Sequence, residues 1–192
     1  VYLVIYWQVP RARPGALVVL PILLLIGIWA AGESALPGKL PATYDSMLLW
    51  IHVLIGKLFL GICLAAVGLA GILLLRRMFG AGGFLSGLPA DTVLDALVWK
   101  FISAAFVFHS GMLIAGAVWA QDAWGRYWDW DPLETWAFIT WLAMGLSLHA
   151  RVSCKVSQSM GWLMVLGIFT LAFLTFFGVP FSSLGPHKGV LQ

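Results

Sequence analysis

Residues 101–150 have the sequence FISAAFVFHSGMLIAGAVWAQDAWGRYWDWDPLETWAFITWLAMGLSLHA. Two apolar runs, 101–120 and 133–150, flank the tryptophan-rich stretch Trp124–Pro132. Each run is close to the roughly 20 residues that an α-helix needs to cross the hydrocarbon core of a bilayer. Inside lipid the backbone groups must be paired, which a helix achieves by itself. The stretch therefore predicts two transmembrane helices joined by an aromatic loop at the membrane boundary.

The composition of the whole chain supports a membrane protein. Hydrophobic residues make up 61% of the 192 residues and charged residues only 10%, which is more apolar surface than a soluble domain of this length can hide. The net charge of +3 is small and indicates membrane orientation rather than nucleic-acid binding. The two cysteines, Cys63 and Cys154, have neither the spacing of a metal site nor a disulfide framework. The sequence also lacks Cys-x-x-Cys-His, so the chain is not itself a c-type cytochrome.

Three further apolar runs have the length of a span. The sequence therefore predicts an all-α, polytopic transmembrane helix bundle with about five spans and a tryptophan-rich external loop. The expected spans are residues 15–31, 47–75, 101–120, 133–150 and 160–179. The connections are short, so we expect one membrane domain over residues 1–192. Val1 is not an initiator residue and Val1–Pro10 resembles the tail of an earlier apolar segment, so we also expect an excerpt of a longer protein.

Basic residues indicate how the spans are oriented. With five spans they all fall on one side of the membrane, which the positive-inside rule makes cytoplasmic. These residues are Arg11, Arg13, Arg76, Arg77, Lys100, Arg151 and Lys155. The opposite, external side then receives the 32–46 loop, the tryptophan-rich stretch and the tail from about residue 180.

The aromatic loop is unusually dense in tryptophan. Six of the eleven tryptophans fall within 23 residues, namely Trp119, Trp124, Trp128, Trp130, Trp136 and Trp141. Such a shelf of aromatic rings at the water boundary suits a large flat ligand. An interfacial aromatic belt is the alternative, but belts scatter Trp and Tyr over many helix ends.

The four histidines fall into two groups. The expected topology places His52 and His187 on the external side with the tryptophan-rich stretch, and two neutral imidazoles flanking an aromatic shelf suit axial ligation of a haem iron. Two ordinary interfacial histidines are the alternative. His149 lies near the inner boundary and His109 near the middle of the bilayer, where an ionisable residue is a functional candidate. Their depths differ by about 10 Å, so we do not expect them to ligate one iron. A hydrogen bond at a helix contact is expected for His109.

Polar residues of the loop have structural explanations beside functional ones. Asp131 is a suitable N-cap, Pro132 suits a first helical turn, and Glu134 has capping-box-like spacing, so this run is expected to start the helix at about residue 133. We assign Asp131 a structural role first and ligand contact second. Arg126 is available as a cation for a carboxylate such as a haem propionate, or is a solvated loop charge.

The run AVWAQDAWGRYWDWDPLETWAFITW, residues 117–141, closely resembles the signature of the CcsA-type haem-handling proteins of system II cytochrome c maturation. Their tryptophan-rich "WWD" domain is shared more loosely with CcmC and CcmF, and the Pro132-x-Glu134-Thr135-Trp136 continuation favours CcsA. Leu49–Val53 resembles the segment of the first external histidine, and Leu184–His187 that of the second. His149 resembles the histidine within the membrane. The likeness covers most of the chain from about residue 44.

The resemblance implies haem export and delivery. It implies that His52 and His187 ligate the iron of haem b externally, and that His149 does so within the membrane with a ligand from a CcsB (ResB-type) partner. Apocytochrome c, with its Cys-x-x-Cys-His motif, would then dock, and its two thiols would add to the haem vinyl groups. The chain would be a subunit of a holocytochrome c synthetase in a bacterial inner membrane or a thylakoid, with no catalytic residue of its own. The implied haem-contacting segment is 119–136, with Trp119, Trp124, Gly125, Arg126, Tyr127, Trp128, Trp130, Asp131, Pro132, Glu134 and Trp136.

The sequence departs from the family at two positions and leaves other functions open. Leu133 stands where the family often has lysine, and His109 stands where an apolar residue is expected. A haem transporter or chaperone without synthetase activity, as in the CcmC class, is one alternative. A b-type cytochrome carrying electrons across the membrane is another, but it requires histidine pairs at matching depth. A purely structural membrane subunit is the last.

Overall fold

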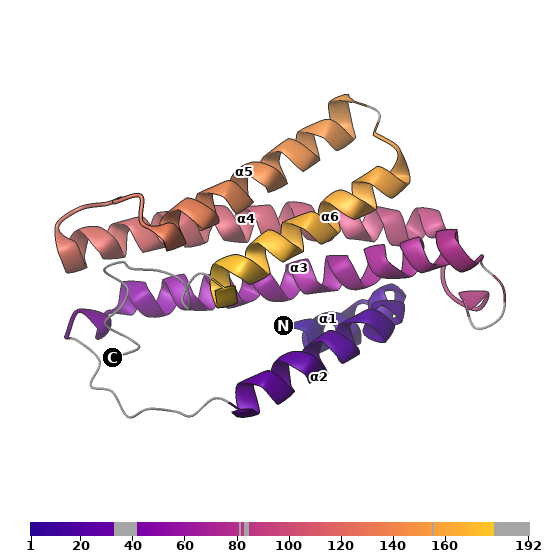
Figure 1. Ribbon diagram of the computed structural model, residues 1–192, viewed down its shortest axis with the longest axis horizontal. Coiled ribbons are helices and arrows are strands. Elements are labelled where there is room, and N and C mark those ends of the chain that lie inside the picture. The colour runs from indigo at the N-terminus through magenta and orange to yellow at the C-terminus, as the bar shows by residue number, and fades with distance from the viewer. Residues whose placement is uncertain (33–41, 81, 83–84, 155, 179–192) are drawn as a thin grey trace.

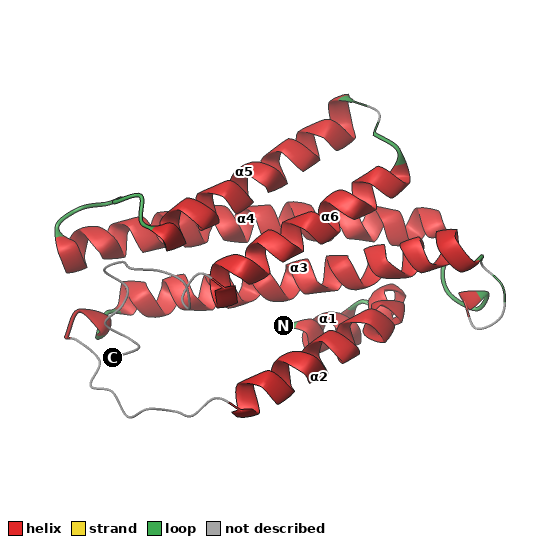
Figure 2. Cartoon of the chain, viewed as in Figure 1, coloured by secondary structure: helices red, strands yellow, loops and turns green. Residues whose placement is uncertain are grey.

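Helices form all the regular structure in the described part of the chain (Figures 1 and 2). The computed structural model describes residues 1–32, 42–80, 82, 85–154 and 156–178. The elements are α1 (Tyr2–Gln8), the 3-10 helix η1 (Pro10–Gly15), α2 (Ala16–Gly32), the 3-10 helix η2 (Ala42–Tyr44), α3 (Met47–Phe79), α4 (Asp91–Trp124), α5 (Pro132–Ser153), α6 (Gln158–Phe173) and the π-helical turn η4 (Leu174–Gly178). The predicted all-α fold is confirmed.

Four helical stretches of the described residues are long and apolar enough to cross a membrane. They are Pro10–Ile28, Met47–Phe79, Asp91–Trp124 and Gln158–Gly178. The expected span at 133–150 is α5, a helix of 22 residues that is not among the four. Polar residues such as Thr140, Ser147 and Arg151 make it less apolar than the other spans. At about 1.5 Å per residue α5 is about 33 Å long, which matches the roughly 30 Å thickness of a hydrocarbon core.

The long helix α3 lies at the centre of the bundle and packs against most other elements. It runs antiparallel to α4 along its length, with α6 on one side and α1 and α2 on another (Figure 1). Its buried side chains include Phe59, Cys63, Leu69 and Leu73. Small residues between them let neighbouring helices approach closely, which is the usual basis of packing inside membranes. The α3–α4 pair therefore fixes the positions of the side chains at both of its ends.

The helix α4 extends further than the sequence predicted. It begins at Asp91 rather than at about residue 101, so Lys100 lies within the helix instead of before it. The added turns still belong to the core, because Leu94 and Val98 are fully buried against it. The length of an apolar run predicts the part of a helix that lies in the hydrocarbon core. It does not predict helical turns that continue beyond the core.

The two ends of the bundle differ in composition. We call one the basic end: it contains the last turns of α3 and α5, with Arg76, Arg77 and Arg151, and the first turns of α4. The other, the tryptophan end, contains the first turns of α3 and α5, the last turns of α4 and the 125–131 loop. The helices run antiparallel, so these two sets of residues lie at opposite ends (Figure 1). The predicted grouping of these basic residues away from the tryptophan-rich loop is thus confirmed.

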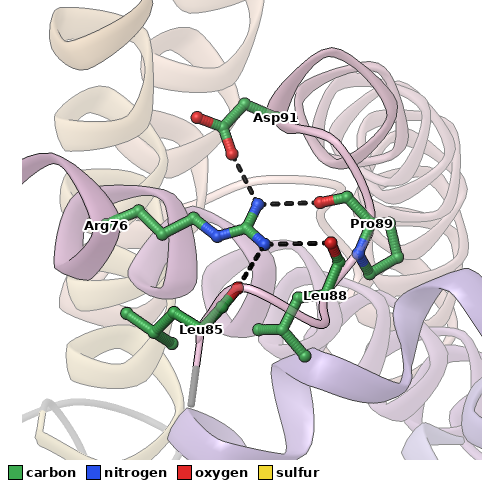
Figure 3. A network of polar contacts seen from close by, with 5 residues as sticks. All are labelled: Arg76, Leu85, Leu88, Pro89 and Asp91. Atoms are coloured by element: carbon green, nitrogen blue, oxygen red, sulfur yellow. Dashed lines mark hydrogen bonds and ion pairs between the residues drawn. The ribbon is translucent and has the colours of Figure 1, made fainter. Parts of the chain in front are cut away.

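A buried guanidinium closes the loop between α3 and α4 at the basic end (Figure 3). Arg76 is only 7% exposed. It donates hydrogen bonds to the carbonyl oxygens of Leu85 at 2.7 Å, Leu88 at 3.0 Å and Pro89 at 2.7 Å, and to the carboxylate of Asp91 at 2.6 Å. These four hydrogen-bond acceptors around one guanidinium compensate for the removal of its charge from water. Arg76 therefore holds the loop against the start of α4.

A second buried network joins α4, α5 and α6 at the same end. The carboxylate of Asp95, which is 5% exposed, accepts hydrogen bonds from the guanidinium of Arg151 and from the indole N–H of Trp162, the latter at 2.8 Å. Arg151 also lies over the ring of Trp99, 5.4 Å from its centroid. A single acceptor thus ties three helices together.

Candidate functional site

His52 lies on α3 with its ring against α4. Its Nδ1 is 2.9 Å from the carbonyl oxygen of Met112. A carbonyl only accepts, so Nδ1 carries a proton, and in the neutral imidazole Nε2 then has the lone pair. Metal-ligating histidines are typically held in this way, with one nitrogen donating to a backbone carbonyl. His52 is therefore in the tautomer that can ligate iron through Nε2.

Trp119 is on α4, and it lies with its neighbours directly beyond the ring of His52, which comes from α3. Trp119 is 4% exposed, and its indole N–H donates to the carbonyl oxygen of Thr43 at 3.1 Å. Its ring meets Tyr44 and Trp124 edge to face, with centroid distances of 5.6 and 4.8 Å. Burial in this cluster raises the pKa of the Tyr44 phenol. The cluster ties η2 to α4 and so has a structural function, whether or not it also contacts a ligand.

The loop that follows α4 has an unusual backbone. Gly125 ends the helix in the left-handed conformation, with φ of 76°. Such an end favours glycine. Trp130 also has a positive φ, 56°, which is uncommon for a residue with a side chain. Its ring is 66% exposed and that of Tyr127 is 60% exposed. Arg126 is not a free cation here, because it forms an ion pair with Asp129.

The predicted start of α5 is confirmed. Asp131 is the N-cap and its carboxylate accepts the N–H of Glu134 at 2.8 Å, while Pro132 occupies the first turn. The carboxylate of Glu134 accepts the N–H of Asp129 at 2.8 Å rather than that of the N-cap residue. The capping interaction thus extends back into the loop and holds the turn before Trp130.

A second aromatic group runs from the loop along α5 to α4. Trp128 and Trp130 contact each other and Phe138, with centroid distances of 5.7 to 6.3 Å. Phe138 stacks on Trp141 at 6.0 Å, and Trp141 stacks on Phe106 at 5.4 Å. The indole N–H of Trp128 is buried and has no acceptor among the described residues. Trp136 is half-buried on the first turns of α5.

The tryptophans do not form a single flat shelf. Trp119 and Trp124 belong to the group with Tyr44, whereas Trp128, Trp130 and Trp141 belong to the group with Phe138. Contacts within the loop are edge to face, with an interplanar angle of 81° between Trp128 and Trp130. A flat ligand would therefore meet ring edges as well as the exposed face of Trp130.

His109 forms the helix contact that the sequence predicted. Its ring is fully buried, its Nε2 donates to the carbonyl oxygen of Ala137 on α5 at 3.0 Å, and it meets the ring of Phe59 edge to face at 4.2 Å. Phe59 follows His52 by seven residues on α3, which is about 10 Å along the helix. His52 and His109 therefore lie at different depths.

His149 lies far from the other two described histidines. It follows Ala137, the partner of His109, by twelve residues on α5, which is about 18 Å along the helix. The sequence predicted a smaller offset, but the conclusion that His109 and His149 do not share an iron is the same. The side chain of His149 is exposed on the surface of the bundle. It is thus accessible to a membrane partner.

The structure brings part of the predicted site together. His52 and the 119–136 segment share the tryptophan end, while His149 lies toward the basic end. His187 falls outside the described residues. Sequence reasoning missed Met112, Gly116, Phe138 and Phe106, which support or extend the site. Only Phe138 had a signal in the sequence, because it precedes Trp141 by three residues, a spacing that puts two side chains on one face of a helix.

A polytopic helical membrane protein with an oriented histidine beneath a tryptophan-rich loop is the class that fold and site define. A family model described as "Cytochrome C assembly protein" matches residues 2–187. The chain therefore belongs to the cytochrome c assembly protein family.

Individual relatives point to the CcsA type within this family. The chain is 41% identical over 102 residues to the cytochrome c biogenesis protein CcsA of Citrus sinensis. It is 39% identical over 95 residues to the proteins of the same name from Cuscuta reflexa and Panax ginseng. Each alignment covers 50% of this chain but only 30%, 31% and 30% of the respective relatives. The matched region is thus less than a third of each relative, and the resemblance to the CcsA type is confirmed.

Proposed function

We propose that this chain handles haem b for cytochrome c maturation. In this proposal it is the haem-handling subunit of a system II cytochrome c synthetase, which takes haem from the membrane and presents it to apocytochrome c. Membership in the cytochrome c assembly family and the likeness to proteins named CcsA support this assignment. Haem is the cargo, and the chain supplies ligands and a binding surface.

The observation that carries the proposal is the geometry of His52. Its Nδ1–H is committed to the carbonyl oxygen of Met112, and its Nε2 has a lone pair suited to iron. The ring of His52 packs against Gly116, which precedes Trp119 by three residues on α4. The ring therefore lies about 5 Å below Trp119 along the helix. An imidazole oriented in this way beneath an aromatic loop fits an axial haem ligand, with His187 as the second ligand.

Residues of the loop fit the other parts of a haem molecule. The exposed face of Trp130 suits the macrocycle. The buried N–H of Trp128 lacks an acceptor among the described residues, and a propionate oxygen would provide one. Arg126, half exposed and paired with Asp129, can exchange that carboxylate for a propionate. We assign the rest of the 119–136 segment to shaping this surface.

His149 fits a second haem position within the membrane. Its side chain is exposed, and it forms no hydrogen bond or ion pair with the described residues. An ionisable side chain that faces lipid is costly, and a partner subunit covering it would lower this cost. We propose that a CcsB (ResB-type) subunit supplies the second iron ligand there, and that haem passes from this position to the tryptophan end.

Attachment requires reduced thiols and correctly placed haem. Each cysteine S–H of the Cys-x-x-Cys-His motif adds across a vinyl C=C bond, with sulfur bonding one carbon and hydrogen the other, so no external oxidant is consumed. The histidine of the apocytochrome then replaces one external iron ligand. The main contribution of the chain is holding the reactants close together, a contribution that can reach several kcal/mol.

The charge distribution supports one orientation in the membrane. The basic end faces the cytoplasm, or the stroma in a plastid, because positively charged segments remain on that side. The tryptophan end then faces the periplasm or the thylakoid lumen, where apocytochrome c is matured. This orientation places His52 and the 119–136 segment on the external side.

Visible spectroscopy of the purified complex tests the proposal. The chain is expressed with its partner, and spectra are recorded before and after dithionite for the wild type and for His52→Ala, His187→Ala and His149→Ala. We expect split α and β bands from a bis-histidine haem, which weaken in the two external variants and return with added imidazole. His109→Gln is the matched control, because it keeps a donor for the carbonyl of Ala137.

Two outcomes would overturn or narrow the proposal. A wild type without haem, or spectra that no external variant changes, would exclude haem handling at the tryptophan end. Haem bound as expected, but without thioether formation when reduced apocytochrome c is added, would favour the chaperone function of the CcmC class. A transmembrane b-type cytochrome is disfavoured by the different depths of His52, His109 and His149.

A further inference from the structure

We propose that Gly116 on α4 is a positioning residue for His52, an inference that rests on the proposed function. A Cβ atom at position 116 would lie 2.8 Å from both Cε1 and Nδ1 of the His52 ring. Carbon atoms in ordinary contact are about 3.5 to 4.0 Å apart. The imidazole therefore occupies the space that any side chain at position 116 would need.

The hydrogen bond of His52 explains why the ring must approach so closely. Its acceptor is the carbonyl oxygen of Met112, four residues before Gly116 on α4. In an α-helix this oxygen already accepts the backbone N–H of residue 116, so the imidazole must use its second lone pair. That lone pair lies beside the Cα of residue 116. Glycine leaves this stretch of the helix backbone open to a ring from α3.

The position of the His52 ring affects iron binding. Anchoring Nδ1–H on Met112 fixes both the tautomer and the direction of Nε2. Removing such support from a ligating histidine typically weakens metal binding by roughly 10- to 100-fold. The change Gly116→Ala adds only one methyl group, but it displaces the ring from the carbonyl. We therefore expect it to impair the external haem site although it alters neither a ligand nor an aromatic residue.

A packing role alone is the competing explanation, because small residues also let membrane helices approach each other. Gly111, five residues earlier on α4, provides a matched control. A Cβ there would meet only Ile55, at 3.8 and 4.0 Å, which is ordinary contact. If Gly116 served helix packing alone, Gly116→Ala and Gly111→Ala would have similar effects. Removing the His52 ring would then not relieve the effect of Gly116→Ala.

The test is a double-mutant cycle in the complex with the partner. Haem content, reduced spectra and recovery with imidazole are measured for Gly116→Ala, Gly111→Ala, His52→Ala and Gly116→Ala/His52→Ala. We expect Gly116→Ala to weaken haem binding at the external site by roughly 10-fold or more, seen as a lower haem content that recovers on adding imidazole. Gly111→Ala should behave as the wild type. The double variant should match His52→Ala in yield, thermal stability and imidazole response, because removing the ring removes the clash.

Two other results would contradict either the inference or the function on which it rests. Wild-type spectra in Gly116→Ala, alongside loss in His52→Ala, would exclude the positioning role and leave the proposed function intact. Spectra indifferent to His52→Ala would instead exclude the proposed function itself. If Gly116→Ala fails to fold, the double variant still decides: recovery to the level of His52→Ala supports the inference, and failure to recover shows that position 116 serves helix packing.

Discussion

The basic end and the tryptophan end of the bundle use polar groups in different ways. At the basic end, Arg76 has four acceptors and Asp95 accepts from two donors on other helices. At the tryptophan end, the N–H of Trp128 is buried without an acceptor among the described residues, and Trp130 is exposed at a positive φ. The Nε of Arg76 and the indole N–H of Trp99 at the basic end are also buried without a partner among the described residues. The two ends therefore differ in the buried ion-pair networks of one and in the exposed aromatic rings and positive φ of the other.

This difference indicates where stability and function reside. Residues in sparsely populated backbone conformations cluster at functional sites, where the surrounding structure must hold them in place. Substitutions of Arg76 and Asp95 at the basic end should therefore lower stability while leaving the spectrum of haem at the tryptophan end unchanged in the folded fraction. Exposed positions at the tryptophan end should show the reverse.

The largest effect on stability is expected for Arg76→Met. The change removes four hydrogen bonds and leaves the carbonyl groups of the 85–89 turn without their donor. We expect the free energy of unfolding to fall by about 3–5 kcal/mol. Equilibrium unfolding in mixed detergent micelles measures it. Arg77→Met is the matched control, because Arg77 is exposed and its loss should change stability by less than about 0.5 kcal/mol. Equal effects of the two changes would contradict the role of Arg76.

Two tryptophans of one segment should separate stability from haem binding. Trp119 is 4% exposed with a bonded N–H, so Trp119→Ala should lower stability by about 3 kcal/mol or more. Trp130 is 66% exposed, so Trp130→Ala should change stability by less than about 0.5 kcal/mol. We expect Trp130→Ala nevertheless to weaken haem retention during purification. Full haem content in Trp130→Ala would show that this ring is not part of the binding surface.

The order of the elements was predictable because it depends on signals within a single segment. Apolar length located the helices that begin near Ala16, Met47 and Gln158 to within a few residues. The spacing of Asp131, Pro132 and Glu134 predicted the start of α5, because a cap forms between residues that are close in sequence. Basic residues predicted which helix ends lie together.

Contacts between helices were not predictable in the same way. The anchoring of His52 by Met112 and Gly116 depends on the register of α3 against α4, and no feature of either segment alone reports that register. The hydrogen bonds of the Arg76 guanidinium depend on the path of the 85–89 turn. The angles between the tryptophan rings depend on side-chain packing, so composition indicated an aromatic cluster but not whether its rings share a plane.

The hydrogen bonds of Asp95 should contribute less to stability than those of Arg76. Asp95→Ala removes the acceptor of Trp162 and the partner of Arg151, but the Arg151 side chain is 29% exposed and still contacts the ring of Trp99. We expect a loss of about 2 kcal/mol, measured by the same unfolding experiment. Asp122→Ala, at an exposed position of α4, is the control. A change in the reduced haem spectrum of folded Asp95→Ala would show that the two ends of the bundle are coupled.

The smallest effect is expected at Asp131, where capping and ligand contact can be separated. Asp131→Ala removes the acceptor for the N–H of Glu134 and should lower stability by about 1 kcal/mol. Asp131→Asn keeps an oxygen at the cap, and asparagine caps helices about as well as aspartate. We therefore expect Asp131→Asn to retain both the stability and the haem spectrum of the wild type. If it retains stability but loses haem, the charge of Asp131 acts on the ligand, and the loop has a functional carboxylate in addition to its aromatic rings.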